Sequence, residues 1–559
     1  MFRVLTRRLS PAMVVAVLAL FLAVAGPARA ASGKLLWSNL NNGTVEQADL
    51  ATGAAGSIRP SLAGSEPGGT AVDLVTGRVY WADHNLNRIF FASLDGSETQ
   101  ALSTGSAPIV NPFGLAIDPI TRTIYWANFG ASSAATAIGY AKLDGSGGGA
   151  LTVTGATPLS PSGVAVDLAD GRLYWTNQGN PGYISYASLD NSGNGHDITP
   201  AAGTIHSPEG IAIDPATGRM YWANFGSASI AVANLDGSSA ALLNTTGVAL
   251  NHPAGVALDA ADNKLYWADD VGTDIASANL DGSGAASKLP ISAGDLSGPS
   301  FPAVVTAPAG TGAPALGGGT TVGSTLSCST GTWAEDLPPS LTWRAPQSFS
   351  YTWTLNGSAI PSETGSTLTR AAAGVYTCAA VATNFGGSAT QSSAAHSVLA
   401  TLTVTKTGPG TVSGAGLNCP GSCIAGVAGT AVTLTATPAA GASFTGWSGA
   451  CTGTGPCTVT VDRDTTVSAT FKAAPPQTKL GKATISAKHR TAAFAFSATG
   501  AATSFACALV KGSAAAKFTT CKSPKTYKHL KHGKYTFEVR ATGPGGTDAS
   551  PAAKRFNIT

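Results

Sequence analysis

The side chains best suited to acid–base or metal-assisted chemistry are His206, Glu209 and His252. Imidazole and carboxylate groups can exchange protons with a substrate or bind a metal ion. His206 lies two residues before the proline that opens the next apolar stretch, whereas His252 lies one residue before its own proline. The two histidines therefore hold non-equivalent positions, and isolated surface histidines are the competing interpretation. The sequence contains no nucleophile elbow, phosphate loop or paired catalytic carboxylates, so we expect a binding module and not an enzyme, with no cofactor.

A repeated unit must position these residues. It recurs six times with a length of about 46 residues, as expected for one propeller blade. Each complete unit has an apolar strand after Pro-x-Gly with a central alanine, a Tyr-Trp strand, an Ile-x-x-Ala-x-Leu strand ending in the hairpin signal Asp-Gly, and a weaker fourth strand. The tryptophans that mark the units, separated by 44, 45, 49, 47 and 45 residues, are Trp37, Trp81, Trp126, Trp175, Trp222 and Trp267.

The first unit begins at Lys34 and lacks its own first strand. The missing strand is found at Pro299–Val305, which follows Pro253 by 46 residues and places Ala303 in register with Ala257. Pairing of this segment with the first unit would close the ring and leave no open sheet edge. The sequence therefore predicts an all-β chain with a six-bladed propeller over residues 33–306.

The Tyr-Trp strands carry a family resemblance. Tyr80-Trp81-Ala82-Asp83 and four equivalent tetrapeptides are similar to the YWTD repeats of low-density lipoprotein receptor propellers, although Ala replaces Thr in four of the five and Asn replaces Asp in three. The resemblance implies the fold, because the motif residues are architectural. Asp or Asn stands at the fourth position of all six units, counting Asn39, which suits a side chain that bonds nearby backbone.

Ligand recognition is expected in the loops that do not repeat. Loops entering the first strand and loops joining the second and third strands emerge on the same face of a propeller, and loops on a rigid scaffold commonly carry binding residues. A protein or glycan ligand is our main expectation. The alternative is a lyase or hydrolase similar to virginiamycin B lyase or the gluconolactonases, with His/Glu chemistry at the channel mouth. The candidate residues are His84, Asn85, Phe129, Gln178, Phe225, Asp270, Glu66, Asn111, His206, Glu209 and His252.

Residues 307–317 have the composition of a linker, and residues 318–398 resemble an immunoglobulin-type sandwich. Cys328, Trp353 and Cys378 are evenly spaced, and Tyr376 precedes the second cysteine by two residues. The resemblance implies a disulfide between Cys328 and Cys378 over Trp353, with Tyr376 as a corner tyrosine.

Two further β-rich modules are expected. Residues 399–472, with Phe444-Thr445-Gly446-Trp447, are similar to the divergent internalin B-repeat family, which implies a small spacer or adhesion module. A linker at 473–478 leads to residues 479–559. The segments Cys521–Tyr527 and Phe537–Ala541 of this module resemble Ig-like or fibronectin-like repeats of bacterial exported proteins.

All eight cysteines lie beyond residue 320, which favours disulfides in an exported protein. A zinc site is the competitor, but the close pairs have no histidine nearby. Besides Cys328–Cys378, the expected disulfides are Cys419–Cys423, Cys451–Cys457 and Cys507–Cys521.

Charge is unevenly distributed. Residues 473–559 contain 14 Lys or Arg against two Asp or Glu, whereas residues 31–472 carry a net charge of −13. A basic exported module can adhere to an anionic envelope polymer, and simple solubility is the alternative. Nucleic acid is not an expected partner, and we expect a monomer.

The N-terminus has the pattern of a signal peptide over residues 1–30. Arg3, Arg7 and Arg8 precede the apolar run Met13–Ala25, and small residues precede Ala31. No other apolar stretch is long enough to span a bilayer. We therefore expect a secreted protein, either released or retained non-covalently at the cell wall, that acts in binding or adhesion. A structural spacer without a specific ligand is the third hypothesis.

Overall fold

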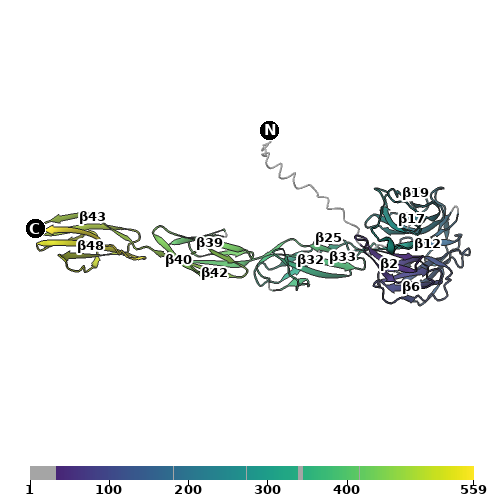
Figure 1. Cartoon of the computed structure of the whole chain (residues 1–559), viewed down its shortest axis with the longest axis horizontal. Coiled ribbons are helices and arrows are strands. Elements are labelled where there is room, and N and C mark those ends of the chain that lie inside the picture. Colours follow the sequence, from purple (N-terminus) through teal and green to yellow (C-terminus); the bar gives the residue numbers. More distant parts are fainter. Residues whose placement is uncertain (1–32, 180–181, 272, 338–343, 370, 415) are drawn as a thin grey trace, which may run out of the picture. The chain divides into compact units, whose positions relative to one another are not determined.

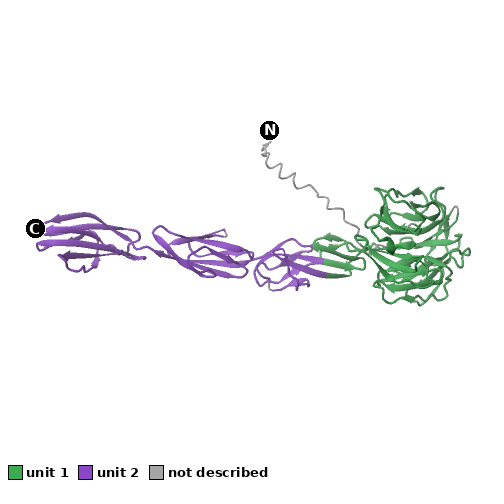
Figure 2. Cartoon of the chain, in the orientation of Figure 1, with its two compact units in different colours: residues 1–313, 330–349, 381–391 green, residues 314–329, 350–380, 392–559 purple. Residues whose placement is uncertain are grey.

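The computed structural model describes residues 33–179, 182–271, 273–337, 344–369, 371–414 and 416–559 (Figure 1). The expected signal peptide lies outside them. The described residues form β-strands and two short 3-10 turns, which confirms the predicted all-β class. None of the described helical segments is long and apolar enough to cross a membrane. The chain divides into two compact units, and the first contains residues 1–313, 330–349 and 381–391 (Figure 2).

Six four-stranded antiparallel sheets make the propeller blades. The first, innermost strands are β24 (Pro299–Thr306), β4 (Pro67–Asp73), β8 (Pro112–Asp118), β12 (Pro161–Asp167), β16 (Pro208–Asp214) and β20 (Pro253–Asp259). The second strands are β1 (Gly33–Asn39), β5 (Arg78–Asp83), β9 (Thr123–Asn128), β13 (Arg172–Asn177), β17 (Arg219–Asn224) and β21 (Lys264–Asp269). The third strands are β2 (Thr44–Asp49), β6 (Arg88–Ser93), β10 (Ile138–Lys142), β14 (Tyr183–Ser188), β18 (Ser229–Asn234) and β22 (Asp274–Asn279). The outer strands are β3 (Ala55–Arg59), β7 (Gln100–Ala101), β11 (Gly148–Ala150), β15 (His196–Ile198), β19 (Ala241–Leu242) and β23 (Ser287–Lys288).

The predicted ring closure is confirmed. Strand β24 pairs antiparallel with β1, with Ala303 opposite Leu36, so one blade combines segments more than 250 residues apart. The six repeat tryptophans are each at most 1% exposed. They pack between neighbouring blades: Trp126, for example, lies in a cluster with Tyr80 and Ile89 of the preceding blade. The aromatic repeat is thus the core of the propeller.

The six first strands approach one another closely around the axis. Gly69, Gly114, Gly163, Gly210 and Gly255 each follow the Pro-x step, and a Cβ atom on any of them would lie closer than 3.0 Å to backbone of the next blade. Toward the ends at which the first strands turn into the second strands, the first strands line a cavity of about 180 Å³. Every residue lining this cavity is apolar, including the six central alanines Ala71, Ala116, Ala165, Ala212, Ala257 and Ala303.

The Asx residue that ends each second strand fixes the loop that enters the first strand. In five blades a side-chain oxygen accepts the backbone N–H of the residue 17 or 18 positions earlier, as from Val110 to Asn128 at 3.0 Å and from Leu159 to Asn177 at 2.9 Å. In the closing blade, Asn39 accepts the N–H of Ser297 at 3.0 Å. The predicted structural role of these residues is confirmed.

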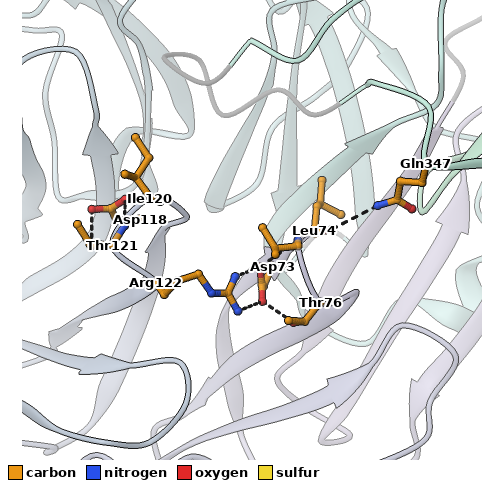
Figure 3. A network of polar contacts seen from close by, with 9 residues as sticks. Asp73, Leu74, Thr76, Asp118, Ile120, Thr121, Arg122 and Gln347 are labelled. Carbon is orange, nitrogen blue, oxygen red and sulfur yellow. Dashed lines mark hydrogen bonds and ion pairs between the residues drawn. The ribbon is translucent and has the colours of Figure 1, made fainter.

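The opposite end of the propeller, where first strands turn into second strands, is called the turn face. There Arg122 forms a two-pronged ion pair with the buried Asp73 of the preceding blade, with Nη2 2.6 Å from Oδ2 (Figure 3). Within the same compact unit, Gln347 donates to the Leu74 carbonyl at 3.4 Å, and Phe385 covers Gly77. The polypeptide that follows the propeller therefore packs against the turn face.

The next module has the features expected of an immunoglobulin-type sandwich. Cys328 and Cys378 are disulfide-bonded, Trp353 is 1% exposed, and the Tyr376 hydroxyl donates to the Ala372 carbonyl at 3.1 Å. Two short strands, β25 and β26, lie within or at the edge of the segment expected to be a linker. The strands are β25 (Gly310–Gly312), β26 (Leu316–Gly318), β27 (Leu326–Cys328), β28 (Thr332–Trp333), β29 (Ser348–Leu355), β30 (Ser358–Ala359), β31 (Thr367–Leu368), β32 (Gly374–Asn384), β33 (Gly387–Ser392) and β34 (His396–Val398).

The following module consists of two four-stranded sheets, ordered β38-β35-β42-β40 and β37-β36-β39-β41. Its core contains Trp447 and Phe471 together with cysteines of both local disulfides, Cys419–Cys423 and Cys451–Cys457. The strands are β35 (Ala400–Thr407), β36 (Gly410–Gly414), β37 (Leu417–Cys419), β38 (Cys423–Val427), β39 (Ala431–Pro438), β40 (Ala442–Gly449), β41 (Cys457–Thr460) and β42 (Thr465–Ala473).

The last module repeats the sheet layout of residues 318–398, with one three-stranded and one five-stranded sheet. Its strand β48 reads Gly-x-Tyr-Thr-Phe where β32 reads Gly-x-Tyr-Thr-Cys, and the Tyr535 hydroxyl donates to the Lys531 carbonyl at 2.8 Å as Tyr376 does four residues back. Phe537 replaces the cysteine and stacks on Phe494 with ring centres 4.1 Å apart. The Cys507–Cys521 disulfide joins neighbouring strands of one sheet. The strands are β43 (Gln477–Ser486), β44 (Thr491–Thr499), β45 (Ser504–Lys511), β46 (Thr519–Cys521), β47 (Lys525–Tyr527), β48 (Gly533–Gly543), β49 (Gly546–Thr547) and β50 (Ala552–Ile558).

Candidate functional site

The propeller end opposite the turn face is called the loop face, and it carries the candidate residues expected from sequence. His84 and Asn85 follow β5, Phe129 follows β9, Gln178 follows β13, Phe225 follows β17 and Asp270 follows β21. The Asx-held entry loops bring His206 and His252 to the same end. Glu209 differs from the expectation of a loop residue, because it is the second residue of strand β16 and is only 4% exposed.

An aromatic group lies where the second, third and closing blades meet. Phe113 contacts Phe129 and Phe301 with ring centres 5.7 Å and 5.1 Å apart, and His84 meets the Phe113 ring edge-on at 5.9 Å. Phe129 is 37% exposed, whereas Phe301 is 8% exposed. Glu66 completes the group through a 2.8 Å ion pair between its carboxylate and the His84 imidazole. A partly exposed apolar platform with a charged rim results.

Sequence reasoning missed Phe113 and Phe301. The signal was present as departures from the repeat: Phe113 holds a position occupied by Gly, Ser, Glu or Ala in the other blades, and Phe301 stands where five blades have glycine. Phe301 has φ of 33°, a left-handed conformation that is uncommon for a bulky residue. A Cβ at Gly68 would contact the Phe113 ring, so the absence of a side chain there makes room for this aromatic.

An acidic pair lies at the loop face between the fifth and sixth blades. The Oε2 atom of Glu209 and the Oδ1 atom of Asp270 are both buried, and neither has a hydrogen-bond partner among the described residues. Asp270 is held by its backbone N–H, which donates to the His252 carbonyl at 3.4 Å. The His252 ring in turn lies 4.6 Å from the ring of Phe225. Four of the predicted residues are thus brought into one region.

Burial controls the ionisation of this acidic pair. Loss of solvent, with a further contribution from the charge of Asp270, raises the pKa of Glu209 to about 8. Burial and the neighbouring Asp269 raise the pKa of Asp270 to about 6, although the His252 charge acts in the opposite direction. At neutral pH Glu209 therefore holds its proton, while Asp270 is ionised. A buried carboxylate oxygen without a donor is a costly arrangement that a cationic group would relieve.

The other candidates have simpler surroundings. The Asn85 side chain donates to the Gly64 carbonyl at 3.0 Å, and the Gln178 backbone N–H donates to the Ser160 carbonyl at 3.1 Å. His206 is half-buried and is fixed through its backbone, which donates to Asn224 at 2.9 Å. Asn111 is exposed, and its N–H donates to the Asn87 side chain at 2.6 Å. Across the described part of the chain, no three His, Cys, Asp or Glu side chains are grouped as metal ligands would be.

Two family models match parts of the chain. Residues 77–119 and 218–260 match the low-density lipoprotein receptor repeat class B, and residues 400–475 match the divergent InlB B-repeat domain. The comparison with curated proteins found no match.

Three solved structures illustrate the similarity in architecture. A chain of the nidogen/laminin complex is 23% identical, with 48% of this chain and 97% of that chain covered and a TM-score of 0.40. Streptogramin B lyase is 13% identical, with 48% and 85% covered and a TM-score of 0.35. A gluconolactonase from Xanthomonas campestris is 17% identical, with 43% and 84% covered and a TM-score of 0.32. Because these TM-scores are low, the function has to be inferred from this chain's own side chains.

Proposed function

We propose that this chain, which contains low-density lipoprotein receptor class B repeats and a divergent InlB B-repeat domain, is an extracellular binding protein whose propeller loop face recognises a protein ligand. The observation that carries the proposal is the presence, on one face, of an aromatic platform at Phe129 and of the acidic pair Glu209 and Asp270, each of which has a buried oxygen without a hydrogen-bond partner among the described residues. Aromatic anchors and buried charges are the groups that dominate binding energy at protein interfaces.

The chemistry of the loop face defines the ligand more closely. The acidic pair suits a lysine or arginine side chain, because a cation would supply the missing hydrogen-bond donors. The Phe113–Phe129 platform suits an apolar or aromatic side chain of the same ligand. Within the first compact unit, Gln347 and Phe385 of the following module contact the turn face, which is the end of the propeller opposite the loop face.

Location outside the cell is supported by the four disulfides. In this proposal the three C-terminal modules separate the propeller from the cell wall and give the protein its role in adhesion. The modules 318–398, 399–472 and 479–559 are the spacing elements.

The test compares loop-face and turn-face variants of the full chain on arrays of exported-protein peptides. Each peptide is also presented with its Lys or Arg replaced by norleucine. We expect Phe129→Ala and Asp270→Asn each to weaken capture about tenfold, which corresponds to loss of one anchor contact. The matched control is Ile120→Ala on the turn face, where Ile120 is 70% exposed. Capture that survives norleucine substitution would contradict the role of the acidic pair.

Two outcomes would replace the proposal. Turnover of lactone or cyclic-ester substrates that disappears in Glu209→Gln and His252→Ala would establish the lyase or hydrolase alternative. Equal capture by the parent, the loop-face variants and an unrelated exported protein would leave only the spacer role.

A further inference from the structure

One end of the last module gathers positive charge from three separate loops. This end, called the basic tip, is formed by the β43–β44 turn, the end of β45 and the loop between β47 and β48. All of its charged and imidazole side chains are exposed. They are Lys488, His489, Arg490, Lys511, Lys528, His529, Lys531, His532 and Lys534.

Specific contacts hold these loops together. Arg490 donates from Nε to the Leu530 carbonyl at 2.8 Å, and the Leu530 N–H donates back to the Arg490 carbonyl at 3.0 Å. The Gly512 N–H donates to the Lys534 carbonyl at 2.9 Å, which brings the end of β45 to the same place. The Tyr535 hydroxyl donates a hydrogen bond to the Lys531 carbonyl and so holds the loop between β47 and β48 against strand β48. The clustering is therefore built into the fold and does not depend on flexible side chains meeting by chance.

No acidic residue of this module neutralises the basic tip. Residues 473–559 are all described, and they contain two acidic side chains, Glu538 and Asp548. Glu538 lies in the middle of β48, opposite Ala508. Asp548 is buried and accepts the Thr478 N–H at 2.7 Å near the start of β43, at the other end of the sheet. Uncompensated like charges repel one another, and a polyanion would remove that repulsion.

We infer that the basic tip is a binding site for a flexible acidic polymer whose carboxylate or phosphate groups repeat along the chain. Five of its six Lys and Arg residues are lysine, a compact point charge without the fork geometry of arginine. Such a spread of point charges matches repeated anionic groups better than one phosphate held in a pocket. This site is separate from the propeller loop face.

The composition of the tip favours a polymer over a lipid surface or a nucleic acid. Peripheral membrane binding buries apolar and aromatic side chains, and single-stranded nucleic acids stack on aromatic ones. Within residues 473–559 the exposed large apolar side chain is Ile485, at 37%. The Tyr535 ring, 5.9 Å from the Lys511 ammonium group, is 7% exposed, and Tyr527 next to Lys528 is partly buried; both pack in the module core.

The experiment measures binding of the full chain to immobilised polygalacturonate and to polyphosphate. The tip variant carries Lys528→Gln, Lys531→Gln and Lys534→Gln. The control carries Lys479→Gln, Lys522→Gln and Lys554→Gln, which removes the same charge from exposed positions outside the tip. We expect the tip variant to bind about tenfold more weakly than the control, from three lost ion contacts of modest strength each. Binding of the parent should weaken between about 0.1 M and about 1 M salt, because the Debye screening length becomes shorter.

The two polymer arms show whether carboxylate or phosphate is preferred. An equal loss of polymer binding in the tip variant and in the control would mean that binding follows net charge alone. Unchanged binding in both variants would mean that the basic tip does not bind the polymer. Either result overturns the inference. Stronger tip-dependent binding to phosphatidylglycerol vesicles or to single-stranded DNA would also overturn it, in favour of a membrane or nucleic acid. Circular dichroism melting of the variants confirms that all three proteins are folded.

Discussion

Ser297 donates its backbone N–H to the side-chain oxygen of Asn39 at 3.0 Å, across 258 residues of sequence. Asn39 also accepts from the Trp37 indole at 3.1 Å and donates to the Asp295 carbonyl at 3.0 Å. It is 1% exposed. This residue therefore joins the two ends of the propeller in the way that the equivalent Asp or Asn of each other blade joins its own entry loop.

The first prediction concerns this closure. Asn39→Ala should lower the free energy of unfolding of the propeller by about 2–4 kcal/mol, because several buried groups lose their partner. Asn42→Ala is the control, since Asn42 is exposed and bonds only within its turn to Thr44. Urea unfolding followed by tryptophan fluorescence reports on the propeller, which contains six of the ten tryptophans. Equal stability of the two variants would contradict the role of Asn39.

The glycine contacts around the axis give a second prediction. Gly163→Ala should destabilise the propeller by about 1–3 kcal/mol, because the new methyl group would collide with the Glu209 carbonyl. Gly147→Ala should be neutral or stabilising, since a Cβ there has open space and the backbone does not have positive φ. The same unfolding measurement checks both, and a neutral Gly163→Ala would show that the first strands are not packed as described.

Glu209 makes propeller stability depend on pH. Its pKa is about 8 when folded and near the ordinary 4.5 when unfolded, so the folded state binds the proton more tightly. The stabilisation that proton binding by Glu209 gives to the folded state is fully present below pH 4.5 and is lost as the pH rises through about 8. Asp270, with a pKa of about 6, acts in the same direction over a narrower range.

Glu209→Gln should consequently flatten the pH profile. At pH values above about 8 it should exceed the parent in unfolding free energy by up to about 4 kcal/mol, while near pH 4 the two should agree. Glu98→Gln serves as control, because the Glu98 side chain is 55% exposed in its pair with Arg78. The unfolding free energies of the parent and of Glu209→Gln could instead change by the same amount from pH 5 to 8. That result would contradict a buried, protonated Glu209 carboxyl group.

Ligand binding should depend on pH in the opposite sense. A cation held by the acidic pair needs the ionised carboxylates, so affinity for lysine- or arginine-containing peptides should increase from pH 5 to 8 as Asp270 and then Glu209 lose their protons. Calorimetry in buffers of different ionisation enthalpy should detect proton release on binding at neutral pH. Two results together would exclude Glu209 and Asp270 from the binding site. Peptide affinity would be constant from pH 5 to 8, and the Asp270→Asn variant would bind as tightly as the parent.

The corner tyrosines give a last prediction. Tyr376→Phe and Tyr535→Phe should each cost their own module about 1 kcal/mol, the net value of one hydrogen bond to a backbone carbonyl. Hydrogen exchange of the β32 and β48 amides separates the two modules within the full chain. Increased exchange in both strands after either single change would show that the effect is not local.

The fold could be predicted because its determinants are local and repeated. Tyr-Trp strands, Pro-x-Gly steps and Asp-Gly turns specify the same blade six times, and the spacing of Pro299 from Pro253 was enough to find the closing strand. The corner tyrosine and the Cys328–Cys378 disulfide were likewise visible as a fixed spacing around Trp353. The blade patterns report short-range backbone requirements that the chain meets in the same way at every occurrence, and this regularity made the long-range closing strand recognisable.

The candidate site was only partly predictable, because it is made of residues that break the repeat. The sequence placed His84, Phe129, Phe225, His252 and Asp270 on one face, but it assigned Glu209 to a loop and overlooked Phe113 and Phe301.

The sequence by itself determined the six blades, their closure and the excess of basic residues after residue 473. Only the tertiary structure decided that Glu209 is buried beside Asp270 without a donor, that Phe113 fills the space above Gly68, and that the basic charges of three loops meet at one end of a module. The physical reason is that ionisation and side-chain packing depend on neighbours distant in sequence, whereas strand and turn formation depend on neighbours along the chain.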